Sequence, residues 1–170
     1  MTQSNTREEG FEQLIERALV GSTIEERALE GIELNASFAD AQAPTENQFY
    51  WGIPSDFDKR NAVDVRRLWS FLEATQSDIL SQWRGRGDVR TNVMKEIKRT
   101  IESCGSLEVL RKGIEVDNLQ GDKKLRLFYP KPTAADSAES HRRYAMNQFS
   151  VTRQATYSLS HRGYEIDLVI

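Results

Sequence analysis

The sequence predicts a mixed α+β fold in which a mixed sheet of about four strands is flanked by helices, with a helical insertion ahead of the sheet. Apolar residues recur at helical spacing as far as Ile101, and strand-like runs follow from Leu107 to the last residue. With 170 residues, of which 38% are hydrophobic and 29% charged, the chain can bury a core as one domain or a little more.

The N-terminal third is predicted to contain two helices and a loop. Residues 1–9 are polar and are expected to form a disordered tail, so the folded domain is expected to span residues 10–170. An amphipathic helix ending near Gly21 is predicted by apolar residues at i, i+3, i+4, i+7 and i+8: Phe11, Leu14, Ile15, Ala18 and Leu19. A second, short helix is predicted near 24–29, and the aromatic residues of 45–57, with Gly52 and Pro54, indicate an ordered loop.

Three further helices are predicted in the middle of the chain. Val65, Leu68, Trp69 and Leu72 mark the first, and Ile79, Leu80 and Trp83 mark a short second one. The third follows Asp88 as N-cap, carries Val89, Val93, Ile97 and Ile101 on one face, and stops near Gly105. The tryptophans Trp51, Trp69 and Trp83 are expected in the core.

Strands are predicted to dominate the last third. Residues 107–116 and the alternating Leu125, Leu127 and Tyr129 indicate strands on either side of a turn at 118–123. Asp136 and Glu139 resemble a capping box for a short helix through Tyr144. Residues 149–158 and 164–170 are predicted to form a hairpin around 160–163.

Composition excludes several classes of protein. A net charge of −3 and a pI of about 5.5 argue mildly against a dedicated nucleic-acid binder. The single cysteine, Cys104, excludes an internal disulfide and fits a reducing cytoplasm, and it is expected to be inert. With only His141 and His161 besides, both expected at the surface, a structural zinc site is not expected. No apolar run reaches the ~20 residues of a membrane span, so no membrane partner is expected.

Asp167 stands in the apolar run that closes the chain, where a carboxylate costs free energy unless it reaches solvent, a partner or a metal. Alternate residues of a strand share a face, which places Glu165 and Asp167 together, and two carboxylates can hold a divalent cation. The local pattern alone favours the other interpretation, an amphipathic strand with its charged face in water.

The C-terminal stretch resembles a known family. Asn147–Gln154, with Thr152-Arg153-Gln154, and then Ile166-Asp167-Leu168-Val169 are similar to the N-terminal nuclease region of the R subunit of type I restriction enzymes, a PD-(D/E)xK nuclease. Three weaker segments match the same family in order, and they are residues 22–26, 56–76 and 105–132. The resemblance implies an incomplete restriction-endonuclease-like core.

The resemblance implies that Asp167 is the first catalytic carboxylate and a ligand of Mg²⁺. The family follows it with a strand bearing Glu-x-Lys, which this sequence lacks after Asp167, so we expect the domain to be truncated and inactive on its own. Glu96-Ile97-Lys98 spells the motif but lies in a predicted helix upstream, and Asp122-Lys123-Lys124 lies in a predicted turn. Neither replaces the missing strand.

Other residues are candidates for metal or DNA contacts. Nucleases of this class often add a glutamate from the first helix, which here is Glu12 or Glu16; a charge on the outer face of the helix is an equally good interpretation. Arg142, Arg143 and Arg153 could bind DNA phosphates, or be surface arginines that pair with Glu139 or Glu165. Gln154 could contact DNA or cap the sheet.

The predicted function is therefore Mg²⁺-dependent cleavage of double-stranded DNA. In the family it is coupled to ATP-driven translocation by motor domains absent from this chain, in the cytoplasm, with specificity and methyltransferase subunits as partners. Self-association through an exposed sheet edge is also expected. The alternative is a non-catalytic protein-interaction module derived from this nuclease fold.

Overall fold

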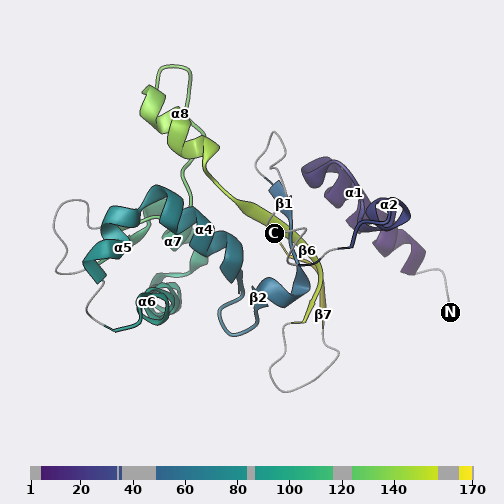
Figure 1. Cartoon of the computed structure of the whole chain (residues 1–170), viewed down its shortest axis with the longest axis horizontal. Coiled ribbons are helices and arrows are strands. Elements are labelled where there is room, and N and C mark those ends of the chain that lie inside the picture. Colours follow the sequence, from purple (N-terminus) through teal and green to yellow (C-terminus); the bar gives the residue numbers. More distant parts are fainter. Residues whose placement is uncertain are drawn as a thin grey trace. The chain divides into compact units, whose positions relative to one another are not determined.

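The computed structural model describes residues 5–33, 35, 49–83, 87–116, 124–156 and 165–169, and side chains within these ranges except for 5–9, 154, 156 and 165–169. Helices and short sheets are mixed, as the sequence predicts at the level of fold class (Figure 1). The chain divides into two compact units. Unit 1 comprises Met1–Arg67 and Gln148–Ile170, and unit 2 comprises Leu68–Asn147.

Unit 1 is built on a mixed three-stranded sheet in the order β1-β6-β7. Strand β1 (Phe49–Trp51) pairs in parallel with β6 (Phe149–Thr156), and β6 pairs in antiparallel fashion with β7 (Glu165–Val169). The predicted hairpin is confirmed, although its turn lies outside the described residues. The prediction of a loop at 45–57 is wrong at β1, because three successive aromatic residues favour a strand.

Helix α1 (Asn5–Val20) packs against β1 and β6 (Figure 1). It begins within the residues expected to form a tail, because Arg7, Glu8 and Glu9 are favourable in helices. The helix itself is confirmed, but its buried side chains include Glu16 and Val20, whereas Phe11 and Leu14 are exposed. The buried face of α1 is therefore not the apolar stripe of the sequence.

Helix α2 (Ile24–Leu29) is also confirmed, and a capping box starts it. The Glu26 amide donates to the Thr23 hydroxyl at 3.3 Å, and the Thr23 amide donates to the Glu26 carboxylate at 2.9 Å. After β1, unit 1 continues with the 3₁₀ helix η1 (Pro54–Asp56) and the short antiparallel pair of β2 (Phe57–Asp58) and β3 (Val63–Asp64).

The core of unit 2 lies among the predicted helices, which are α4 (Val65–Thr75), α5 (Ser77–Trp83) and α6 (Val89–Cys104). Asp88 caps α6 as predicted by accepting from the Thr91 amide at 2.8 Å, and Gly105 ends it at φ +84°. The three tryptophans are buried as expected, with Trp51 in unit 1 and Trp69 and Trp83 in unit 2.

The strands predicted at 107–116 and 125–129 are largely wrong. Residues Ser106–Lys112 form helix α7, since Leu, Glu, Arg and Lys favour helices, and only β4 (Ile114–Glu115) and β5 (Lys124–Leu125) pair as strands. Two buried side-chain amides bind the backbone of residues 126–129, in place of the hydrogen bonds of a neighbouring strand. Gln76 bonds both the N–H and the carbonyl of Arg126 (2.7 and 2.9 Å), and Asn147 bonds both those of Tyr129 (2.8 and 2.7 Å).

Helix α8 (Ala138–Ala145) occurs where the sequence predicts a helix, but its cap differs. The Ser137 hydroxyl accepts from the Ser140 amide at 3.2 Å. Asp136 instead accepts from the amide and hydroxyl of Thr133 at 2.6 and 2.7 Å, so it shapes the turn before the helix.

Candidate functional site

Three of the residues that the sequence predicts for a site meet in unit 1. Glu12 and Glu16 lie four positions apart on α1, and Arg153 lies in the middle of β6. The backbones of Gln154 and Asp167 belong to β6 and β7, and their side chains lie outside the described residues. Arg142 and Arg143 belong to α8 in unit 2.

Arg153 is a buried arginine, 8% exposed, that contacts three carboxylates. Its Nη2 lies 3.1 Å from Glu12 Oε2, and its Nη1 lies 3.5 Å from Glu16 Oε2 and donates to Glu25 Oε1 at 2.6 Å. Arg153 is therefore not the surface arginine that one interpretation of the sequence required. Its contacts join α1 and α2 to β6.

Sequence reasoning did not single out Glu25. The capping box orients the first turn of α2, and Glu25 lies in that turn beside Glu26. A local signal existed, since the Thr-x-x-Glu pattern of residues 23–26 predicts where the helix begins. No local spacing, however, could show that its partner is an arginine more than a hundred positions later.

Glu16 has the most perturbed carboxyl group of this cluster. Burial raises its pKa from 4.5 to about 7, although the nearby Arg153 charge and the Ile24 amide act in the opposite direction. Neither carboxylate oxygen has a hydrogen bond of ordinary geometry, and the side chain is fully buried. For Glu25, burial also raises the pKa, but backbone and Arg153 hydrogen bonds outweigh it and the pKa is lowered overall. Glu16 is thus the member of the cluster that takes up a proton near neutral pH.

Glu16→Gln is expected to stabilise the protein at pH 8 and to change little at pH 4.5. The folded-state pKa lies above the unfolded value, so the stability linked to Glu16 is fully present below 4.5 and is lost as the pH rises through about 7. The difference corresponds to about 3 kcal/mol at most. Urea unfolding at both pH values measures it. Glu25→Gln is the control and should destabilise at pH 8; a Glu16→Gln variant with the pH dependence of the wild type would contradict the expectation.

The cation that this cluster holds among the described side chains is Arg153. Among the residues that the structure describes, no group of three or more His, Cys, Asp or Glu side chains is arranged to hold one. The Arg153 guanidinium occupies the place between Glu12 and Glu16 where a cation would bind. In the strand register, the backbone of Arg153 is opposite that of Leu168, the neighbour of Asp167. That Glu12 or Glu16 joins Asp167 at one metal ion stays a prediction.

Arg142 and Arg143 both pair with Glu139 on the exposed face of α8, as one interpretation of the sequence expected. Arg142 donates to the Glu139 carboxylate at 2.8 and 2.9 Å, and Arg143 donates at 2.7 Å. The two guanidinium groups lower the pKa of Glu139 to about 2. Contact of these arginines with DNA stays a prediction.

The two other segments that match the (Asp/Glu)-x-Lys pattern have charged residues in separate ion pairs. On α6, Glu96 pairs with Arg99, and Lys98 pairs with Glu102 at 3.9 Å. In residues 122–124, Lys124 pairs with Glu115 at 3.5 Å, and Asp122 lies outside the described residues. His141 is exposed on α8, as expected, and His161 lies outside the described residues.

A second charged group in unit 1 was not predicted. Burial raises the pKa of Asp64, which accepts from the Arg67 amide at 3.0 Å and from the Ser150 side chain. The buried Arg67 guanidinium lies 4.0 Å above the Tyr50 ring. These contacts connect β3 and the start of α4 to β1 and β6, which is a structural role.

Comparisons with models of protein families, with curated proteins and with solved structures gave no match to this chain. Within the described part of the chain, no helix combines the length and the apolarity that crossing a membrane requires.

Proposed function

We propose that this chain supplies part of the Mg²⁺-dependent nuclease region of a type I restriction R subunit. The observation that carries the proposal is the β6–β7 hairpin, because it sets Asp167 in the middle of a strand that pairs with β6, as the sequence resemblance requires. The packing of α1 beside the same sheet supports a restriction-endonuclease-like core.

Asp167 is the residue that we propose as the metal ligand. When bound, Mg²⁺ would polarise the scissile phosphate of double-stranded DNA. Glu12 and Glu16 have Arg153 between them and are assigned instead to joining α1 to the sheet. Within the given sequence, Glu-x-Lys occurs only at Glu96–Lys98, on α6.

The partners and the energy source belong to the same proposal. Specificity and methyltransferase subunits would choose the DNA site, and ATP would drive motor domains that are not among these residues. Arg142 and Arg143 are the proposed phosphate contacts, since each is exposed and one carboxylate serves both.

The proposal is tested by DNA binding with and without Mg²⁺, measured as fluorescence anisotropy of a labelled duplex. Binding by the wild-type chain is expected to strengthen when Mg²⁺ is added, because the Asp167 carboxylate then holds a cation against the phosphate instead of repelling it. Asp167→Asn is expected to bind about tenfold more tightly than the wild type without metal, a change of about 1.4 kcal/mol, and to lose the response to Mg²⁺. Asp122→Asn is the control and should behave as the wild type.

The alternative function, a protein-interaction module, is favoured by one observation. Phe11 and Leu14 lie one turn apart on α1 with 65% and 63% of their surfaces exposed. For such a module, Asp167 has no role in binding metal. An Mg²⁺ response that is the same in Asp167→Asn and the wild type would therefore favour the module over the nuclease.

A further inference from the structure

Helix α1 has its charged and apolar residues the opposite way round from an ordinary surface helix. The side that faces the sheet carries Glu12 and Glu16, which contact Arg153 of β6. A surface helix usually turns its apolar stripe inward and its charged residues toward water. Of the described side chains of α1, the exposed ones are Phe11, Leu14, Arg17 and Ala18. Three of these four are apolar, so the outer face of α1 leaves an apolar stripe in water.

The exposed apolar residues have the spacing of a seam between two helices. Phe11, Leu14 and Ala18 are separated by three and then by four positions, so they form one line along about two turns of α1. Gly21 follows the helix and continues this line with open space around it, since a Cβ atom there would meet nothing within 4 Å. In a seam of this kind, each large side chain enters a hole between four residues of the facing helix.

The stripe complements a second copy of itself. When two α1 helices run antiparallel with Leu14 of each copy at a twofold axis, residue 11 of one copy comes opposite residue 17 of the other. Phe11 then faces the hole between residues 14, 17, 18 and 21 of the second copy. Two members of that hole, Ala18 and Gly21, are small and leave room for the phenyl ring. The largest residue of the stripe thus meets its two smallest ones.

The charge beside the stripe also suits antiparallel pairing. Arg17 is the charged residue among the exposed described side chains of α1, and its guanidinium pairs with Glu26 in the first turn of α2. Antiparallel pairing keeps the two Arg17 side chains at opposite ends of the contact and sets each beside a Phe11 ring, to which a guanidinium is attracted. Parallel pairing would bring the two arginines together and align the helix dipoles, which is unfavourable.

We propose that two copies of this chain associate through α1 as an antiparallel, twofold-symmetric pair. The contact is one helix face, which is smaller than the standard interface of roughly 1,600 Å², so the dimer is expected to be weak and to depend on concentration. This surface is distinct from the sheet edge through which the sequence predicts self-association. The proposed metal ligand and phosphate contacts lie elsewhere, so the pairing does not rest on the proposed nuclease function.

Sedimentation velocity of the 170-residue chain over a roughly 100-fold range of concentration tests the proposal. The wild type is expected to shift from monomer to dimer as the concentration rises. Leu14→Glu is expected to weaken the dimer at least about tenfold, because two glutamates would meet at the axis. Leu107→Glu is the matched control and should dimerise as the wild type does. Leu107 is similarly exposed, 59% against 63% for Leu14, but lies on α7 in unit 2.

Mixing two variants tests the twofold axis itself. Leu14→Lys alone is expected to be as monomeric as Leu14→Glu, because two like charges again meet at the axis. An equimolar mixture of the two variants is expected to recover the dimer, since a lysine then meets a glutamate. The recovery requires that position 14 of one copy faces position 14 of the other, so it distinguishes this pairing from any contact of α1 with a different surface.

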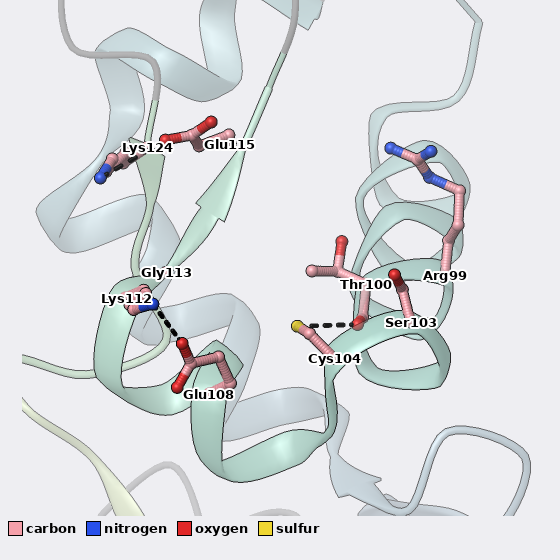
Figure 2. A pocket seen from close by; sticks show the side chains of 9 residues that line it. All are labelled: Arg99, Thr100, Ser103, Cys104, Glu108, Lys112, Gly113, Glu115 and Lys124. Carbon is pink, nitrogen blue, oxygen red and sulfur yellow. Dashed lines mark hydrogen bonds and ion pairs between the residues drawn. The ribbon is translucent and has the colours of Figure 1, made fainter.

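A disulfide provides an independent readout of the same geometry. The single cysteine, Cys104, lies in unit 2, where its thiol donates to the Thr100 carbonyl at 3.2 Å (Figure 2), and Cys104→Ser removes it. In that background, Leu14→Cys is expected to form a disulfide-linked dimer under mild oxidation, because residues at the axis of a helix pair approach the ~7 Å between Cα atoms that a disulfide allows. Leu29→Cys, at an exposed position on α2, is the control and should remain largely unlinked.

Three outcomes would overturn the proposal. They are a wild-type chain that stays monomeric at the highest concentration, a dimer that is unchanged in Leu14→Glu, and a mixture of the two charged variants that stays monomeric. Circular dichroism of each variant checks that it is folded, which is expected because Leu14 is mostly exposed. A negative result in the Mg²⁺-dependent DNA-binding test would leave these outcomes unchanged, so the two proposals fail separately.

Discussion

Arg153→Met is expected to lower the free energy of unfolding by about 3–5 kcal/mol at pH 8, because it leaves the buried Glu16 and the partly buried Glu12 and Glu25 without their cation. Methionine keeps much of the apolar stem of the side chain, so the loss of stability measures the effect of removing the charge. Glu16 has no hydrogen bond of ordinary geometry to replace the contact, and Glu25 loses its 2.6 Å bond. Urea unfolding, with hydrogen exchange of the β6 amides as a local readout, measures the effect.

Arg143→Met is the matched control, because its guanidinium also contacts a glutamate but lies on the exposed face of α8. Its cost is expected to be about 1 kcal/mol or less. The cost of Arg153→Met should shrink in a Glu16→Gln background, since the two residues interact. Equal costs for Arg153→Met and Arg143→Met would show that the buried cluster does not contribute as its geometry indicates.

Gly52→Ala is expected to destabilise unit 1 by about 3 kcal/mol, the upper part of the range for an overpacked core. A Cβ atom at position 52 would lie 1.8 Å from Thr152 Oγ1, 2.9 Å from its Cβ and 3.2 Å from its Cα. The Gly52 amide also donates to the Val151 carbonyl at 2.8 Å, which keeps the two backbones close. Relief therefore requires a shift of β1 away from β6, which hydrogen exchange of the amides of both strands would detect.

Gly10→Ala is the control that separates the clash at position 52 from the effect of replacing a glycine in general, because the two substitutions should change stability in opposite directions. Gly10→Ala places a Cβ atom on α1 with nothing within 4 Å and is expected to stabilise the helix by about 0.5–1 kcal/mol. Thr152→Ala removes the nearest atom and should recover part of the loss in the double variant. A Gly52→Ala protein as stable as the wild type, with unchanged exchange in β1, would contradict the expectation.

Elements specified by nearby residues could be predicted from the sequence. Helix α6 has its cap at Asp88, its apolar spacing and its stop at Gly105 within one continuous segment. The β6–β7 hairpin likewise depends on two adjacent apolar runs. The segment of α7 is predicted as a strand because the spacing of Leu107, Val109 and Leu110 fits both a helix and a strand. The helix propensity of its residues and the helix end at Gly113 favour the helix that the structure contains.

Interactions between distant residues could not be predicted in this way. The dual bonds of Gln76 and Asn147 to the 126–129 segment replace a strand ladder, and nothing in the alternation of Leu125, Leu127 and Tyr129 indicates them. The sequence predicts Glu12 or Glu16 as a metal ligand and Arg153 as a DNA contact, which are separate roles. Only the packing of α1 on β6 shows that they neutralise one another.

The parallel pairing of β1 with β6 has a consequence for how the chain folds. Phe49 is in register with Phe149, a hundred positions later, so unit 1 cannot complete its sheet until all of unit 2 has been synthesised. Closing so long a flexible loop is entropically costly and slows folding. If unit 2 folds first, the chain between the two strands is compact instead of flexible, which lowers this entropic cost. The Arg153 cluster would then form after the helices of unit 2 have packed, although its described members Glu12, Glu16, Glu25 and Arg153 all belong to unit 1.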